Sequence, residues 1–276
     1  MKPLDVRSLV REFDLHTKKS LGQNWLVDES ALARIADAAE LGQQDLVLEI
    51  GPGLGSLTRY LAERAGRVVA VELDNTLIPP LRRVLADYSN VTLIQGDILQ
   101  IDLASLLSPA AQYKVVANLP YYITSAVLRH LLEAAIRPAL LVLTVQLEVA
   151  RRITAAPGQL SLLAVSVQFY GRPFIVTHIK AESFYPVPQV DSAVVCIEPY
   201  ERPVVDVADR DQFFSVVKAG FAQKRKQLHN ALSAGLARPQ AEIARALGEA
   251  DLDGRRRAET LTLDEWAVLA RALQDR

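Results

Sequence analysis

Four consecutive residues, Asn118-Leu119-Pro120-Tyr121, carry groups suited to chemistry on an aromatic amine. The exocyclic amine of adenine is a poor nucleophile because its lone pair is delocalised into the ring. The side-chain oxygen of Asn118 and the backbone carbonyl before Pro120 can accept its hydrogens, while Tyr121 can stack on an extruded base. We therefore predict a reaction at the N6 amine of adenine. An Asx-Pro turn followed by core aromatics is the alternative interpretation.

A glycine-dense turn, Glu49-Ile50-Gly51-Pro52-Gly53-Leu54-Gly55, follows a strand-like run and precedes a helix expected to begin near Ser56. Its glycines let the backbone lie against a ligand. The G-x-G-x-G spacing differs from the G-x-G-x-x-G turn with which dehydrogenases seat a pyrophosphate. It fits S-adenosylmethionine better, because the amino acid end of that methyl donor needs backbone donors and acceptors, and a carboxylate such as Glu49 near its ammonium. A tight turn without a ligand is the alternative.

Two further acidic residues lie at the ends of the next two strand-like runs. Glu72 lies about 20 positions after the glycine turn and is placed to accept both ribose hydroxyls of an adenosyl group. Asp97 can accept the exocyclic amine of the cofactor's adenine, while Ile98 packs on the ring. Each carboxylate alone could cap a helix, but three at successive strand ends are harder to explain by capping. NAD shares the need for Glu72, so an NAD-dependent oxidoreductase is a competing hypothesis.

The elements that must position these groups alternate along the chain. From about Ala31, helix-period segments such as Leu57–Arg64 and Pro80–Tyr88 separate short β-rich runs. These runs end at Ile50, Leu73, Gln95, Leu119 and Gln146. The alternation predicts an α/β fold with a mainly parallel sheet covered on both faces. In such sheets the functional loops lie at the carboxyl ends of the strands.

The chain changes character in its second half. Three strand-like stretches, LLAVSVQFY, FIVTHI and DSAVVCIE, are expected to complete the same sheet. From Tyr200 a linker-like segment leads into helix-period patterns broken by Gly235, Pro239 and Gly254. We therefore predict a sheet domain at residues 1–200 and a small all-helical domain at residues 201–276.

The charge balance limits how this chain can contact a nucleic acid. Of its 276 residues 50% are hydrophobic and 23% are charged, and the formal net charge is −1. There is no global cationic field, so any such contact must be local. Short basic clusters could provide it, or could be solvated helix faces. They are Lys18-Lys19, Arg151-Arg152, Lys224-Arg225-Lys226 and Arg255-Arg256-Arg257.

We expect a cytoplasmic protein that binds no membrane and no metal. The longest apolar run, Pro138–Val145, is far shorter than the roughly 20 residues of a transmembrane helix, and the N-terminus lacks a secretory hydrophobic region. The single cysteine, Cys196, lies in an alternating apolar run and is expected in a buried strand. One cysteine excludes a disulfide scaffold and a clustered Cys/His zinc site.

Several motifs follow one another in the order of a known family. They are KKSLGQNWL (18–26), EIGPGLGSLT, VELD, QGD, NLPYYIT, Gln146-x-Glu148-Val149-Ala150 and FYPVPQVDSAV, with further matches at 221–232 and 259–266. Over nearly the whole chain they resemble the ribosomal RNA adenine dimethyltransferase family. The resemblance implies a Rossmann-like class I S-adenosylmethionine-dependent methyltransferase domain, with a mainly parallel seven-stranded sheet, followed by a small all-α domain.

The same resemblance assigns roles at matching positions. It implies a cofactor pocket formed by Asn24, Leu26, Gly51, Glu72, Asp97 and Asn118, and a target adenine held between Tyr121 and Phe184. It also implies dimethylation of two adjacent adenosines in the 3′-terminal hairpin of small-subunit (16S) ribosomal RNA. The expected partner is that RNA in the immature small subunit, gripped by the helical domain of a monomeric enzyme.

Three departures from the family pattern are visible. Trp25 replaces the usual phenylalanine, Leu147 replaces the usual lysine of a Gln-Lys-Glu run, and only Ala156–Gln159 stands where the family has a longer basic loop. These changes leave the expected cofactor pocket unaltered. They remove positive charge near the expected RNA cleft, so they bear on docking more than on catalysis.

Other functions share parts of this pattern. A relative that methylates an adenine of large-subunit ribosomal RNA and confers antibiotic resistance is the alternative within the enzyme class, although the C-terminal matches argue against it. A checkpoint role in small-subunit assembly, acting through 224–226 and 255–257, is the alternative outside it. Proximity and orientation suffice for in-line methyl transfer, so we expect His16, His130, His178 and His229 to be structural or surface residues.

Overall fold

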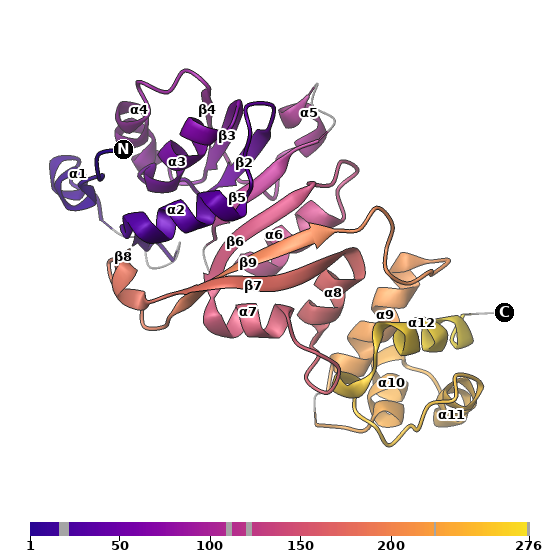
Figure 1. Ribbon diagram of the computed structural model, residues 1–276. Coiled ribbons are helices and arrows are strands. Elements are labelled where there is room, and N and C mark those ends of the chain that lie inside the picture. Colours follow the sequence, from indigo (N-terminus) through magenta and orange to yellow (C-terminus); the bar gives the residue numbers. More distant parts are fainter. Residues whose placement is uncertain (17–21, 109–111, 120–122, 224, 275–276) are drawn as a thin grey trace. The chain divides into compact units, whose positions relative to one another are not determined.

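The computed structural model describes residues 1–16, 22–108, 112–119, 123–223 and 225–274. The chain divides into two compact units (Figure 1). The sheet unit comprises Met1–Ala150 and Pro173–Pro199, and the helical unit comprises Arg151–Arg172 and Tyr200–Arg276. In the described part of the chain, no helix is long and apolar enough to cross a membrane.

A seven-stranded sheet forms the centre of the sheet unit, in the order β4-β3-β2-β5-β6-β9-β7. Strands β4 to β6 of this order run parallel, and β9 pairs with β6 antiparallel. The bounds are β2 Leu46–Ile50, β3 Arg67–Glu72, β4 Val91–Gln95, β5 Lys114–Asn118, β6 Leu140–Gln146, β7 Gly171–Ile179 and β9 Ser192–Pro199. The expected mainly parallel α/β sheet is confirmed. Because the strand order reverses between β2 and β5, the carboxyl ends of these two strands flank a topological switch point.

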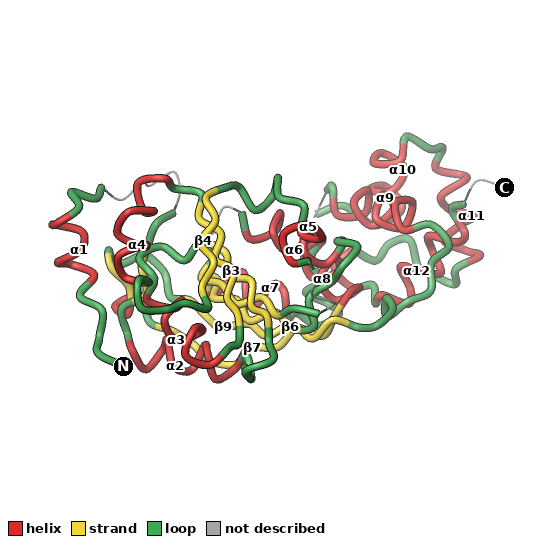
Figure 2. The backbone as a smooth tube through the Cα atoms, turned by 90° about the horizontal axis from the view of Figure 1, so that it is seen from above, coloured by secondary structure: helices red, strands yellow, loops and turns green. Residues whose placement is uncertain are grey.

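Helices cover both faces of this sheet. One face packs its valines, among them Val47, Val68 and Val116, against α2 and α3 in a continuous apolar core. Figure 2 shows α5 and α6 on the opposite side, as right-handed crossovers require. The helices of this unit are α1 Val6–Glu12, α2 Glu29–Ala38, α3 Ser56–Arg64, α4 Ile78–Val84, α5 Leu103–Leu107 and α6 Thr124–Leu132, and α7 Leu147–Ile153 follows β6. Cys196 is buried in this core, as predicted.

A second, two-stranded sheet joins distant parts of the chain. Strand β1 (Trp25–Leu26) pairs antiparallel with β8 (Phe184–Tyr185). Helix α1 packs beside it, because Val6 and Leu9 form a small core with Trp25. The segment that precedes the large sheet is therefore fixed to a loop far along the sequence.

The helical unit contains α8 Leu162–Tyr170, α9 Arg210–Phe221, α10 Leu228–Leu236, α11 Gln240–Glu249 and α12 Leu263–Ala272. Phe169, Phe213 and Phe214 form an aromatic cluster between α8 and α9. Thr262 and Glu265 close the start of α12 with a capping box, which satisfies two backbone N–H groups there. The predicted all-helical C-terminal segment is therefore observed from α9 onward.

Two predictions about residues 151–172 were wrong. LLAVSVQFY forms helix α8 rather than a strand, and it belongs with the helical unit rather than with a sheet domain ending at residue 200. Ser161 caps the helix by accepting from the N–H of Ala164, and Gln168 donates to the carbonyls of Ile153 and Ala155. The helix is apolar on most of its surface because it is largely buried, so neither period stands out in its sequence. Tertiary packing overrides the β preference of its valines.

Candidate functional site

A pocket opens in the sheet unit at the carboxyl ends of β2, β3, β4 and β5, and encloses about 1060 Å³ including its mouth. All nine residues predicted to contact a cofactor line it: Asn24, Leu26, Glu49, Gly51, Gly53, Glu72, Asp97, Ile98 and Asn118. Residues separated by up to 94 positions are thus brought together at one edge of the sheet, while their individual roles stay predictions.

The glycine turn forms the floor at the end of β2. The N–H of Gly51 donates to the carbonyl of Val71 at 2.9 Å, which ties the turn to the neighbouring strand. Gly53 has a φ of 61°, in the left-handed region that favours glycine. A Cβ atom there would lie 2.7 Å from Cδ1 of Trp25. The indole therefore occupies the space that a side chain at position 53 would need.

Glu72 ends β3 with a buried carboxylate that points into this turn. Its oxygens accept the N–H of Gly53 at 3.1 Å and the N–H of Asp74 at 2.8 Å. Burial raises the pKa of Glu72, and the two backbone donors oppose that shift. Each carboxylate oxygen has a second lone pair, so Glu72 can still accept hydroxyl hydrogens from a ligand in the pocket.

Glu49 is the second buried acid of the pocket wall, with only 1% of its surface exposed. Its Oε2 has no hydrogen-bond partner within the described part of the chain. Burial raises the pKa of Glu49 to about 8, and the charge of Glu72 contributes in the same direction. An orphaned buried carboxyl oxygen on a pocket wall fits a cationic ligand group, such as the ammonium of a methyl donor.

Asp97 and Ile98 follow β4 at the next strand end. The N–H of Gly96 donates to the carbonyl of Glu72 at 2.8 Å, which holds this turn beside β3. Asp97 accepts the N–H of Leu99 at 3.0 Å and keeps acceptor capacity toward the pocket, and Ile98 is buried. This pair can read an amine and cover an aromatic ring.

Asn118 ends β5 and is oriented by the N-terminal arm, residues 22–28. Its Nδ2 donates to the carbonyl of Asn24 at 3.3 Å. With the amide nitrogen directed to the arm, Oδ1 is the end available to accept a substrate hydrogen. The N–H of Leu119 donates to Thr144 of β6 at 3.1 Å, which fixes the peptide that follows. Pro120 and Tyr121 lie outside the described residues.

Phe184, the remaining predicted substrate contact, lies on β8 and lines the pocket opposite Leu26. The residue is 2% exposed, so its side chain is held in the wall rather than projecting into solvent. The pocket therefore combines a buried acid with remaining acceptor capacity, an orphaned carboxyl oxygen that fits an ammonium, an oriented amide oxygen and an aromatic wall.

Comparison with known proteins decides the family. The model of the family described as ribosomal RNA adenine dimethylase matches residues 15–270. The chain belongs to the ribosomal RNA adenine dimethylase family. It is accordingly an rRNA adenine dimethyltransferase, and S-adenosylmethionine is its methyl donor.

Individual relatives span both units of this dimethylase. The chain is 47% identical to ribosomal RNA small subunit methyltransferase A of Moorella thermoacetica, over 97% of this chain and 96% of the relative. It is 41% identical to the protein of that name from Alkaliphilus metalliredigens, over 100% and 98%. Among solved structures, the 23S rRNA methyltransferase ErmE matches with 31% identity and a TM-score of 0.70, over 91% of this chain and 99% of that one.

A dimethyladenosine transferase from Plasmodium falciparum shares the fold of this dimethylase. The match has a TM-score of 0.75 at 24% identity, over 89% of this chain and 95% of that one. The class I methyltransferase fold predicted from the sequence is therefore confirmed.

The basic residues predicted to contact RNA lie in the helical unit, either before α9 and between α9 and α10 or in the loop at 255–257. Arg151, Arg152, Arg225 and Lys226 are exposed, and Lys224 lies outside the described residues. Arg255 pairs with Asp253 and Arg257 with Glu259, both on the surface. Such exposed pairs are weak and leave a guanidinium free to exchange its partner for a phosphate.

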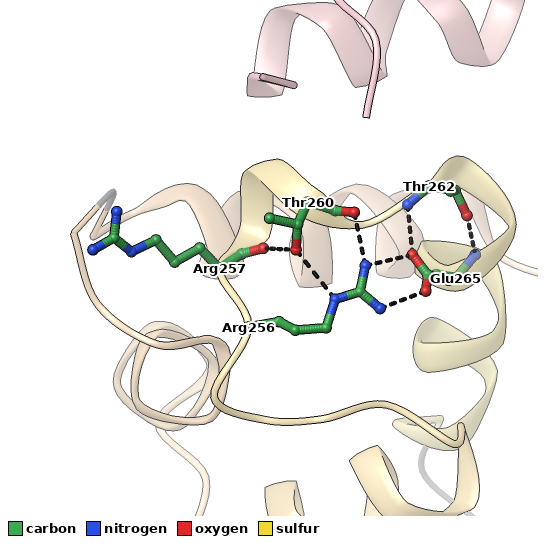
Figure 3. Close-up of polar contacts among 5 residues, drawn as sticks. All are labelled: Arg256, Arg257, Thr260, Thr262 and Glu265. Carbon is green, nitrogen blue, oxygen red and sulfur yellow. Dashed lines mark hydrogen bonds and ion pairs between the residues drawn. The ribbon is translucent and has the colours of Figure 1, made fainter. Parts of the chain in front are cut away.

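Arg256 differs from its two neighbours. Its guanidinium donates to both carboxylate oxygens of Glu265 and to the hydroxyl and carbonyl of Thr260 (Figure 3). The ion pair raises the pKa of Arg256 and lowers that of Glu265. Arg256 therefore links the loop of Arg255–Arg257 to α12 through Glu265. This structural role argues against its predicted contact with RNA.

The sequence did not single out several pocket residues of this dimethylase. Leu32, Leu57, Leu77 and Ile123 line the pocket from helices or from the residues next to them, where their pattern is that of ordinary core positions. Gln23 donates to Asp74 at 2.7 Å and so joins the N-terminal arm to the segment after β3. Only its place within the KKSLGQNWL motif could have drawn attention to it.

Proposed function

We propose that this enzyme transfers two methyl groups to the N6 amine of each of two adjacent adenosines in the 3′-terminal hairpin of small-subunit ribosomal RNA. The observation that carries the proposal is the orientation of Asn118, whose amide nitrogen is held by Asn24 while its oxygen remains available to the pocket. An oxygen acceptor at the end of β5 suits an amine substrate that must present its lone pair.

The residues of the pocket fit S-adenosylmethionine. Glu72 would hold the ribose hydroxyls, Asp97 and Ile98 the adenine, and Glu49 with the turn at Gly51 the amino acid end. When bound, the donor supplies a methyl group on a sulfonium sulfur, and its S–C bond breaks as the N–C bond at N6 forms. Catalysis by the protein is then a matter of proximity and orientation in a site that excludes water.

The chain's own groups prepare the amine. Oδ1 of Asn118 and the carbonyl of Leu119 accept the two amine hydrogens, which directs the lone pair out of the adenine ring plane. Phe184 stacks on one face of the adenine, and Tyr121 is proposed to stack on the other. The methylated amine is acidic and releases its proton to water, so no general base is required. Among the described residues that line the pocket there is no histidine.

We assign RNA binding to the helical unit through Arg151, Arg152, Arg225, Lys226, Arg255 and Arg257, together with Lys224. The substrate is small-subunit RNA in an immature particle, and the enzyme works as a cytoplasmic monomer. The relatives from Moorella and Alkaliphilus, which align along almost their whole length, support this substrate. The likeness to ErmE at 31% identity keeps the large subunit as the competing substrate.

Methyl transfer to purified particles tests the proposal. The protein is incubated with isotopically labelled S-adenosylmethionine and either immature small or immature large subunits, and modified adenosines are mapped. We expect label only on the small subunit, as dimethyladenosine in the 3′-terminal hairpin. Label on the large subunit would show that the proposed substrate is wrong. Thermal stabilisation of the protein by NAD but not by S-adenosylmethionine would show that the proposed methyl transfer is wrong.

A further inference from the structure

The N-terminal arm touches both halves of the pocket. At its beginning Gln23 donates to Asp74, whose own N–H donates to the ribose-binding Glu72. One residue later, the carbonyl of Asn24 accepts the amide of Asn118. The beginning of the arm therefore belongs to the methyl-donor side of the pocket.

The end of the arm belongs to the adenine side. Leu26 lies opposite Phe184 in the β1–β8 pair. The N–H of Val27 then donates to the carbonyl of Ser183 at 2.9 Å, which extends the pairing by one residue. Backbone pairing with residues 25–27 thus fixes the main chain on both sides of Phe184. Backbone pairing alone still allows the two-stranded β1–β8 sheet to twist.

A side-chain hydrogen bond at the end of the β1–β8 sheet adds a further link. Oγ of Ser183 donates to Oδ2 of Asp28 at 3.0 Å. The other oxygen of Asp28 caps α2 by accepting the N–H groups of Ser30 and Ala31 at 2.9 and 3.1 Å. Burial acts to raise the pKa of Asp28, but these hydrogen bonds outweigh it and the pKa is lowered, so the carboxylate stays ionised as an acceptor.

Asp28 is a rigid anchor because the helix that it caps is part of the core. The first turns of α2 bury Ala31, Leu32 and Ile35 almost completely. The hydrogen bond from Ser183 to this cap therefore ties the residue next to Phe184 to a helix whose apolar face is buried in the core. We propose that Asp28 and Ser183 are positioning residues that set the orientation of the Phe184 ring against the target adenine.

The second methyl transfer should depend on this positioning more than the first. The unmodified amine has two hydrogens, which Asn118 and Leu119 can both hold. The monomethyl amine has one, so one of these hydrogen bonds is lost and the stacking wall carries more of the orientation. This inference rests on the proposed adenine dimethylation, and it predicts that loosening Phe184 causes monomethyladenosine to accumulate.

The test compares Ser183→Ala with Ser183→Thr, which keeps a hydroxyl, and with Asp28→Ser, which keeps a helix cap but is too short to reach Ser183. Mono- and dimethyladenosine are quantified in single turnovers on immature small subunits, and S-adenosylmethionine affinity is measured by calorimetry. For Ser183→Ala and Asp28→Ser we expect the second step to slow roughly three- to tenfold, the size of one lost hydrogen bond. Donor affinity should remain unchanged and Ser183→Thr should restore the second step.

Ser105→Ala is the matched control, because Oγ of Ser105 donates to Asp102, the cap of α5, at 2.6 Å on an exposed surface. It should leave the product ratio at the wild-type value. The double variant of Ser183→Ala and Asp28→Ser should be no slower than either single variant if the two residues act through one contact.

Equal slowing of both steps in Ser183→Ala, or a parallel loss of donor affinity, would overturn the positioning role, as would additive effects in the double variant. A wild-type protein that forms no dimethyladenosine would instead overturn the proposed function itself.

Discussion

The side-chain amide of Asn118 has two ends with different tasks. Its nitrogen donates to the carbonyl of Asn24, and we propose that its oxygen accepts a hydrogen of the substrate amine. Replacement by alanine removes both, whereas replacement by aspartate keeps an acceptor oxygen and loses the donor. The two variants therefore separate the catalytic end of the side chain from the end that orients it.

We predict that Asn118→Ala reduces single-turnover methyl transfer by about a hundredfold or more, the scale of a lost transition-state hydrogen bond. Asn118→Asp should retain more activity than Asn118→Ala, because an oxygen still faces the amine. Binding of small subunits should be nearly unchanged in both, since the proposed RNA contacts lie in the helical unit. Equal activities of the two variants would contradict the acceptor role of Oδ1.

Glu49 makes the unfolding free energy of the cofactor-free protein depend on pH, with a defined sign. Burial raises its pKa from 4.5 to about 8, so the folded state holds a proton that the unfolded chain releases above its own pKa. This stabilisation is complete below the unfolded pKa and is lost as the pH rises toward 8, by up to about 1.4 kcal/mol per pH unit. We predict that Glu49→Gln flattens the fall of the unfolding free energy over this range, as measured by urea unfolding. Parallel curves for both proteins would contradict the prediction.

At the scale of elements, the glycine turn and the N-terminal arm are built against each other. A side chain at Gly53 would meet the indole of Trp25, and the φ of 61° there adds backbone strain. Strand β1 is thereby packed directly on the turn after β2. The pocket is consequently shaped by the fit of two loops, not by either one alone.

We predict that Gly53→Ala lowers the free energy of unfolding by about 1–3 kcal/mol and weakens S-adenosylmethionine binding, because either the arm or the turn must move. Gly248→Ala is the matched control. It lies within α11 with open space around its Cβ position, so alanine should stabilise the protein by about 0.5–1 kcal/mol. Chemical unfolding and calorimetry measure both quantities. A Gly53→Ala variant with unaltered affinity for S-adenosylmethionine would contradict the prediction, because it would show that the arm can move without changing the pocket.

At the scale of the whole molecule, a chain of net charge −1 must bind a polyanion through local features. The three consecutive arginines of the helical unit illustrate how this is arranged. Arg255 and Arg257 hold exposed partners, while Arg256 binds Glu265 and Thr260. One arginine shapes the loop, and the two beside it are presented to solvent.

We predict that Arg255→Ala leaves the unfolding free energy within about 0.5 kcal/mol of the wild type and lowers the slope of log affinity for small subunits against log salt by about one. Arg256→Ala should instead destabilise the helical unit by about 1–3 kcal/mol, because the part-buried carboxylate of Glu265 and carbonyl of Thr260 lose their donor. Unfolding curves and salt-dependent binding measure the two effects. A stable Arg256→Ala protein with a reduced salt slope would reverse the assignment.

The sequence by itself determined the chemistry of the strand ends. Glu49, Glu72 and Asn118 lie at the ends of β-rich runs and Asp97 lies just after one. In a parallel sheet such positions converge at one edge whatever the detailed packing. The glycine turn was readable for the same reason, since its backbone conformation is a local property. Periodicity also recovered the strands of the large sheet, except where α8 was mistaken for one.

Only the tertiary structure decided the contacts between segments far apart in the chain. The hydrogen bond of Ser183 to Asp28 joins residues 155 positions apart, and nothing in either local pattern distinguishes it from an ordinary helix cap. The burial of α8, the use of Arg256 as a brace and the packing of Trp25 on Gly53 are of the same kind. Local pattern records which groups a strand end presents, whereas packing decides which of them are held, by what, and with which atom left for the substrate.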